Sequence, residues 1–115
     1  MGEIKDIVGV DRLVHEPARL AIMAVLSACK SADFAFLLNA TGLGKGNLSS
    51  HLAKLKDAGY VEITKSFKGS YPNTSCALTA KGRKAFQAYR KQYLALAERF
   101  EGQAGASRGR TSTSG

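Results

Sequence analysis

The hydrophobic period of the chain changes at Gly59, and this change limits the fold more than any other feature of the sequence. Upstream of the glycine, leucines recur at intervals of four and three, which places them on one stripe of an α-helix. They are Leu48, Leu52 and Leu55. Downstream, apolar and polar residues alternate from 61 to 64, as in a β-strand with one buried face. Because Gly59 can adopt the left-handed conformation that ends a helix, we expect a helix over 46–58 followed directly by a strand.

The flanking segments predict further short elements. Pro17 suits the first position of a helix because its missing N–H would be unsatisfied there, and Asp33 can cap a second helix that Gly42 ends. The run "KGSYPN" predicts a turn between two strands, the second of which is "TSCAL". Thr79 can cap a final helix. The predicted fold class is mainly α with a small β-hairpin, in the order helix, helix, turn, helix, hairpin, helix.

The outer face of the helix at 46–58 is short and polar. Small side chains let a helix backbone approach a partner, and Ser, Asn and Lys side chains can bond phosphates and base edges. A solvated surface that carries small residues explains the same pattern, so the helix alone leaves both interpretations open. The face, with its leading end, consists of Lys45, Gly46, Asn47, Ser49, Ser50, Ala53, Lys54 and Asp57.

The positive charge of the chain is concentrated in one half. The formal net charge is +8. Residues 41–91 contain ten Lys and Arg against two acidic residues, whereas the rest of the chain has seven of each kind. A concentrated basic field indicates a polyanionic partner and favours the nucleic-acid interpretation of the polar helix.

The sequence lacks the patterns of an enzyme or a metal site. We find no nucleophile–base pairing, no carboxylate pair, and no Gly-rich phosphate loop between a strand and a helix. Cys29 and Cys76 are far apart and lack a CxxC spacing, so we expect two small buried residues rather than a disulfide, a redox sensor or a metal site. His51 lies at the edge of the leucine stripe and is expected to be a half-buried structural residue. We therefore expect no enzymatic activity, no cofactor and no bound metal.

The sequence also predicts a cytoplasmic protein without a membrane contact. No apolar run approaches the length of a membrane span, about 18 residues. The segment "MGEIKDIVGV" lacks the basic leader and apolar run of a secretion signal.

Two segments resemble a known family. "GKGNLSSHLAKLKDAGYV" and "FKGSYPNTSCALTAKGRKAF" are similar to short winged-helix transcriptional regulators near the MarR and ArsR families, and the resemblance extends over 13–100. It implies a winged helix-turn-helix that binds double-stranded DNA as a homodimer. The helix at 46–58 would enter the major groove, and the hairpin at 61–78 would lie over the backbone or the minor groove. The DNA-binding positions implied are Lys45, Gly46, Asn47, Ser49, Ser50, Lys54, Lys65, Lys68 and Ser70.

The chain departs from these families in three places. It lacks the cysteine pair of the metal-sensing ArsR relatives, and its hairpin tip carries no arginine where many MarR relatives have one. It is also shorter at the N-terminus than MarR proteins, which use that length for dimerisation and ligand pockets. A small-molecule effector therefore stays unknown.

The last helix carries an apolar stripe at spacings of three, four, three and four, which is the a/d pattern of a coiled coil. The stripe could pack on the first helix of its own chain or pair with a second chain. We expect pairing, because a helix of about 21 residues, roughly 30 Å long, would overhang a small domain. The predicted dimer interface is Phe86, Tyr89, Tyr93, Leu96 and Phe100.

The predicted organisation has four parts. An N-terminal segment (1–12) precedes the winged helix-turn-helix (13–78), a C-terminal dimerisation helix (79–101) and a disordered tail rich in Gly and Ser (102–115). The fold alone does not determine the function, so a winged-helix module for protein interaction or assembly remains the alternative to a DNA-binding regulator.

Overall fold

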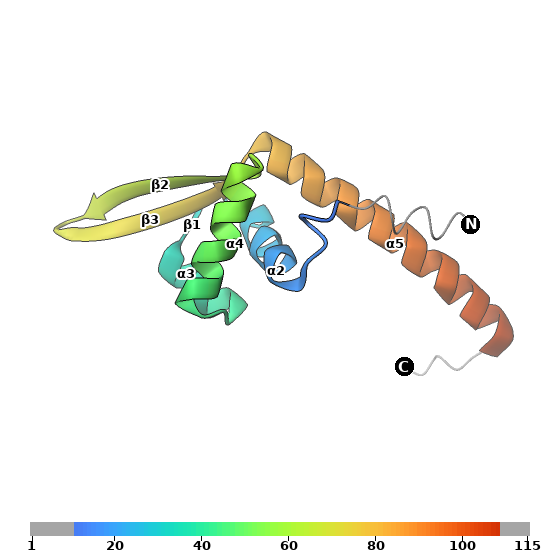
Figure 1. The fold of residues 1–115 in the computed structure, drawn as a ribbon. Helices are drawn as coiled ribbons and strands as arrows, with labels where there is room; N and C mark the ends of the chain where they lie inside the picture. Colours follow the sequence, from blue (N-terminus) through green and yellow to red (C-terminus); the bar gives the residue numbers. More distant parts are fainter. Residues whose placement is uncertain (1–10, 109–115) are drawn as a thin grey trace.

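A computed structural model describes residues 11–108 of the chain, and Figure 1 shows its fold. Residues 1–10 of the predicted N-terminal segment and 109–115 of the predicted tail lie outside the described residues. The predicted fold class is confirmed: short helices pack against the base of a small antiparallel sheet, and a long helix follows at the C-terminus. The elements are α2 (Pro17–Ser27), β1 (Ala32–Asp33), α3 (Phe34–Thr41), α4 (Lys45–Asp57), β2 (Val61–Lys68), β3 (Tyr71–Leu78) and α5 (Ala80–Arg108).

The predicted caps of the first two helices are present. Helix α2 begins at Pro17, and the Asp33 side chain accepts a hydrogen bond from the Phe36 amide, 2.8 Å away, at the start of α3. Gly42 ends α3 in the left-handed conformation, with φ 73°. These caps satisfy backbone groups that the helix interior cannot pair, so α2 begins, and α3 begins and ends, where the sequence predicts.

Helix α4 begins and ends one residue before the predicted helix at 46–58. Gly59 has φ 81°, and the Tyr60 amide then donates to the Leu55 carbonyl at 2.9 Å, which closes the helix end. The three leucines of the stripe are buried. They turn α4 so that its polar face points away from the core.

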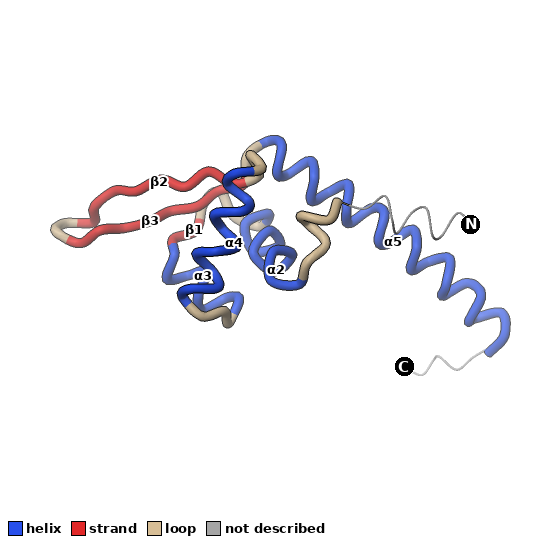
Figure 2. Tube along the Cα trace, viewed as in Figure 1, coloured by secondary structure: helices blue, strands red, loops and turns tan. Residues whose placement is uncertain are grey.

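The sheet has the order β1-β3-β2, and β2 and β3 form an antiparallel hairpin (Figure 2). Its turn is shorter than predicted, because "KGSYPN" contributes only Gly69 and Ser70 to the turn and the remaining residues pair as strands. Pro72 is tolerated in β3 because β1 covers only Ser75 and Cys76, leaving the other side of β3 without a ladder partner at Pro72. Strand β1 was not predicted from the sequence.

The core lies between α2, α3, α4 and the inner face of the sheet. Cys76 is buried there, which raises the pKa of its thiol, and both cysteines are free. Cys76 is therefore a small core residue as predicted, whereas Cys29 lies just beyond α2 and is only partly buried. The buried apolar residues are Val14, Ile22, Met23, Leu26, Ala32, Leu37, Leu48, Leu52, Leu55, Val61, Cys76 and Tyr89.

Helix α5 starts in close contact with the end of α4. The Thr79 hydroxyl accepts from the Gly82 amide at 2.9 Å, as a capping residue does, and donates to the Gly59 carbonyl at 2.6 Å. A Cβ atom on Gly82 would lie 2.0 Å from the Tyr60 carbonyl oxygen. Only a glycine therefore allows this approach of the two backbones.

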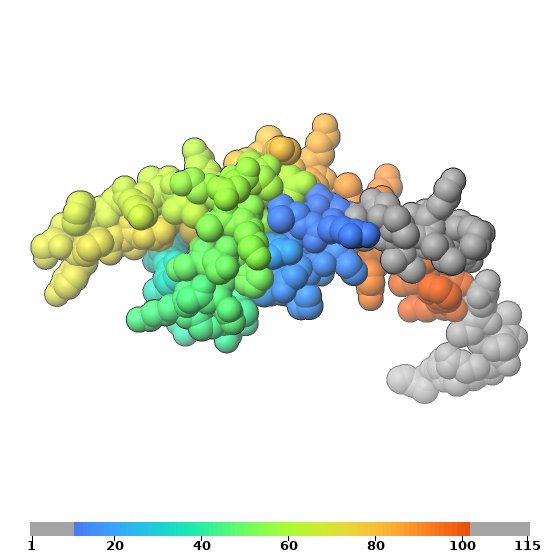
Figure 3. Space-filling view, in the orientation of Figure 1, coloured from blue at the N-terminus to red at the C-terminus, as the bar shows by residue number. Residues whose placement is uncertain are grey.

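Helix α5 is longer than the predicted helix, since it continues through Arg108 rather than ending at 101. The backbone of 102–108 is helical, although these residues belong to the predicted disordered tail. The hairpin and α5 project from opposite sides of the body (Figures 1 and 3). The radius of gyration is 17.6 Å, whereas a compact domain of this length has about 13 Å. No helix within 11–108 is both long enough and apolar enough to cross a membrane.

Candidate nucleic-acid interface

The polar face of α4 is open to solvent. All six positions predicted on this helix and its leading end are exposed, from Lys45 through Lys54. Asp57, the single acidic residue of the helix, stands at its last position, far from the leading end. The face therefore presents amide, hydroxyl and ammonium groups without a carboxylate near its N-terminal half.

The N-terminus of α4 has free hydrogen-bonding capacity. Its N-cap is Gly44, which offers no side chain to the first amides, and the first turn contains no acidic residue. The leading amides and the positive end of the helix dipole are thus available to an anion such as a phosphate group. Lys45 adds a formal charge at the same end.

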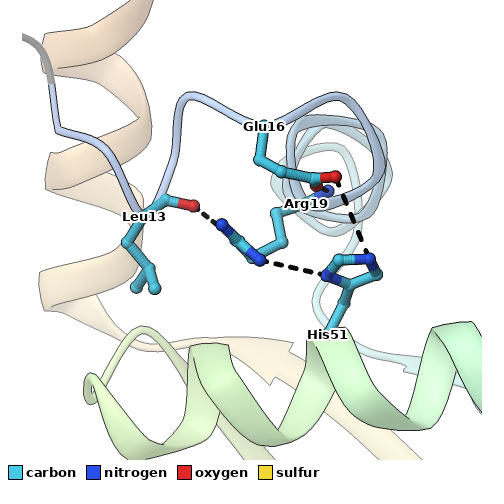
Figure 4. A network of polar contacts seen from close by, with 4 residues as sticks. All are labelled: Leu13, Glu16, Arg19 and His51. Atoms are coloured by element: carbon cyan, nitrogen blue, oxygen red, sulfur yellow. Dashed lines mark hydrogen bonds and ion pairs between the residues drawn. The ribbon is translucent and has the colours of Figure 1, made fainter.

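Helix α4 is tied to α2 by a polar network around Arg19 (Figure 4). The Arg19 guanidinium donates to the Leu13 carbonyl at 2.6 Å and meets Nδ1 of His51 at 3.1 Å. Because an arginine can only donate, His51 accepts at Nδ1 and carries its proton on Nε2, which lies 4.0 Å from the Glu16 carboxylate. His51 is half-buried and structural, as predicted from its place beside the leucines.

Glu16 completes this network from the start of α2. Its carboxylate accepts from the Arg19 amide at 2.7 Å as the helix cap. Burial alone would raise the pKa of Glu16, but the hydrogen bond from the Arg19 amide, together with the nearby His51 imidazole and Arg19 guanidinium, outweighs burial and holds the pKa below its usual value. This role of Glu16 was not predicted from the sequence, although Glu16 directly precedes Pro17 at the predicted helix start. The network fixes the rotation of α4 and so the direction of its polar face.

A groove of about 410 Å³ separates α4 from the hairpin. Its two cations are Lys56 from α4 and Lys65 from β2, and Lys56 was not among the predicted site residues. Helix α4 and the hairpin thus share one concave, basic surface. The groove is lined by Phe34, Ser49, Leu52, Ala53, Lys56, Ile63, Lys65 and Thr74.

The predicted hairpin residues occupy different positions. Lys65 lies in this groove, whereas Lys68 and Ser70 lie at the exposed tip. The Lys68 ammonium is 3.8 Å from the Asp33 carboxylate, an exposed ion pair of little stability. Lys68 would exchange this carboxylate for a phosphate at small cost.

The apolar stripe of α5 is divided between two environments. Tyr89 is 7% exposed and its hydroxyl bonds Nδ1 of His15 at 2.8 Å, while Phe86 packs against the same core. These two residues of the predicted dimer interface thus belong to the fold of the single chain, because α5 lies against α2 in its first half. Tyr93 and Phe100 are more than half exposed, and Leu96 is partly exposed.

Comparisons with known proteins agree with this arrangement. A family model described as a winged helix DNA-binding domain matches residues 18–97. An uncharacterised protein of Methanocaldococcus jannaschii is 33% identical over 90 residues, which cover 78% of this chain and 98% of that protein.

Two solved structures share the fold. A transcriptional regulator homologue from Pyrococcus horikoshii OT3 is 27% identical, with 87% of this chain and 98% of that chain covered and a TM-score of 0.79. A MarR-family regulator from Silicibacter pomeroyi has 20% identity, coverage of 85% and 63%, and a TM-score of 0.61, a likeness of fold alone. The resemblance to winged-helix regulators is confirmed: this protein belongs to the winged helix DNA-binding domain family, and its fold is that of the winged-helix transcriptional regulators.

Proposed function

We propose that this protein is a sequence-specific regulator of transcription that binds double-stranded DNA as a homodimer. Helix α4 lies in the major groove, and the hairpin lies along the backbone or minor groove. The observation that carries the proposal is the exposed face of α4, which combines small polar residues, a free helix N-terminus and a shared basic groove. An acidic or apolar face would instead suit a protein-interaction module, and α4 has neither.

Within this proposal the α4 residues have two roles. Asn47 and Ser50 are exposed on the polar face of α4, away from the buried leucines, where their side chains can bond base edges. Lys45 and Lys54, together with Lys65 in the groove, are placed to neutralise phosphates. The protein needs no enzymatic activity for this function, and within 11–108 no three His, Cys, Asp or Glu residues gather as a metal site.

The proposed dimer uses the outer half of α5. Tyr93, Leu96 and Phe100 continue the stripe beyond Tyr89, where the body of the domain no longer covers it. Exposed apolar stripes of this kind mark contacts with a partner. A two-fold axis through this part of α5 would present two copies of α4 to one face of a duplex, as a palindromic site requires.

Selection of bound duplexes from a random library tests the proposal. We expect a palindromic consensus, and Asn47→Ala should weaken binding to it by about 1–3 kcal/mol while binding to random duplex changes little. Gln87→Ala, which removes an exposed amide from α5, is the matched control and should leave both affinities unchanged. Equal enrichment of all sequences would contradict specific recognition, and an absence of binding at low salt would favour the protein-interaction module.

A further inference from the structure

The tip of the hairpin carries two aromatic side chains that the fold leaves in solvent. Phe67 is 72% exposed and Tyr71 is 76% exposed, more than any other large apolar side chain within 11–108. They flank the Gly69–Ser70 turn, which needs only the positive φ of Gly69, 65°, to form. Neither ring is part of the core, so the fold does not explain them.

The register of the hairpin places Phe67 on the face that borders the groove. Directly opposed residues share a face, and the pairs Ile63–Cys76, Lys65–Thr74 and Phe67–Pro72 follow one another at intervals of two. Ile63, Lys65 and Thr74 line the groove against α4. Phe67 therefore extends the same surface outward, so a partner held by α4 and the groove reaches Phe67 next.

Tyr71 pairs directly with Lys68 across the two strands, so both side chains lie on the face of the tip that Phe67 does not share. From Ile63 to Leu78 the chain has two lysines and no acidic residue. The hairpin itself contributes rings, hydroxyl groups and ammonium groups but no carboxylate, and the nearby Asp33 carboxylate only forms an exposed ion pair with Lys68 at 3.8 Å. Such a surface is complementary to a polyanion with apolar edges. The sugars and base edges of a DNA groove meet this description.

We propose that the hairpin tip reads the DNA minor groove by shape, with Phe67 as an apolar wedge against the base step and Tyr71 and Lys68 on the sugar–phosphate wall. This inference rests on the proposed function. The tip has no arginine to read a narrow groove, and Lys68 is a compact, strongly hydrated cation that does not replace one. Apolar wedges act by partly unstacking a step, so the tip favours deformable pyrimidine–purine steps, such as TA, at a position outside the α4 contacts.

Parallel selections with the full-length chain test the wedge. Phe67→Thr keeps the strand preference of the position but removes the ring, and Phe67→Leu keeps an apolar side chain. We expect the wild-type consensus to contain a TA or CA step on each flank. Phe67→Thr should lose that flank preference and bind the selected duplex roughly five- to a hundred-fold more weakly, while the central consensus is retained. Phe67→Leu should keep the flank preference.

A fluorescent base at the flanking step reports whether the bases there become unstacked, and so distinguishes insertion of Phe67 from a surface contact. 2-Aminopurine at the flanking step should brighten when wild-type protein binds and should stay dim with Phe67→Thr at saturating concentration. An unchanged flank preference in Phe67→Thr, or an equal loss on random and selected duplexes, would overturn the wedge while the proposed function stands. If wild-type protein selects no sequence, the proposed function itself fails. Should Phe67→Thr not fold by circular dichroism, Phe67→Ser, which also removes the ring, takes its place in the same selection and 2-aminopurine measurements, with the same outcomes for and against the wedge.

Discussion

Gly82 holds the start of α5 against the end of α4, and replacing it tests the contact directly. In Gly82→Ala the new Cβ would lie 2.0 Å from the Tyr60 oxygen, whereas ordinary contact begins at 3.4 Å. The helix must therefore move away by more than an ångström. Tyr60 offers backbone rather than a flexible side chain at this point, so the clash cannot be relieved by a change of rotamer.

The cost follows from what this movement breaks. Overpacking costs about 1–3 kcal/mol. The bonds from the Thr79 amide to the Tyr60 oxygen (3.0 Å) and from the Thr79 hydroxyl to the Gly59 oxygen (2.6 Å) would weaken with it, at about 1 kcal/mol each. The higher helix propensity of alanine offsets this loss of stability by about 1 kcal/mol. The net expectation is a loss of about 2–4 kcal/mol, which corresponds to a fall in melting temperature of roughly 8–16 °C.

Gly46→Ala is the matched control, since Gly46 is also helical but a Cβ there meets nothing within 4 Å. It should raise the free energy of unfolding by about 0.5–1 kcal/mol through helix propensity alone. Urea unfolding followed by circular dichroism measures both variants at one protein concentration, so that any contribution of association is the same for each. If Gly82→Ala proves as stable as Gly46→Ala, the two backbones do not meet as described.

Three further outcomes are expected. Lys65→Ala should lower the slope of log affinity against log salt by about one unit and weaken all duplexes alike, as titrations at several salt concentrations would show; an unchanged slope would exclude a phosphate contact. The side-chain hydrogen bond to Asp11 raises the pKa of Tyr60 to about 12, so stability present below pH 10 should be lost as pH rises toward 12, and Tyr60→Phe should lack this alkaline loss in pH-dependent unfolding. Tyr93→Asp with Leu96→Asp should yield a folded monomer in sedimentation at micromolar concentration, whereas Ala88→Asp with Ala95→Asp, which adds the same charge on the exposed side of α5, should stay dimeric; a dimeric first variant would refute the proposed interface.

Local sequence patterns predicted an element correctly where the interactions that form it lie within one short segment. Asp33 and Gly42 bound α3 as predicted because a cap bonds amides only a few residues away. Strand β1 was not predicted because it forms only by pairing with Ser75 and Cys76. A pairing between residues so distant in the chain leaves no local pattern in the sequence. The length of β3 was underestimated because Pro72 reads as a turn residue unless the short span of β1 is known.

The candidate site shows the same division. The exposed face of α4 followed from the leucine spacing, since burying one stripe of a helix exposes the opposite one. The Arg19–His51 contact could not follow from spacing, because it joins two helices whose crossing depends on the whole core. Periodicity likewise identified the stripe of α5 but not its partner, and Tyr89 proved to pack on its own domain.

Helix α5 is packed on the domain only as far as Tyr89. Its outer half can therefore unfold separately from the rest of the domain. Up to Tyr89 the helix is held by the core and by the hydrogen bond to His15. Beyond it, Tyr93, Leu94 and Phe100 are each about half exposed, and a helical segment of that length without packing is marginal in water. In a monomer the outer half of α5 would unfold locally, and its backbone amides would exchange their hydrogens with solvent far sooner than the amides of α4. In the proposed dimer, formation of the outer helix and association of the chains then become a single event.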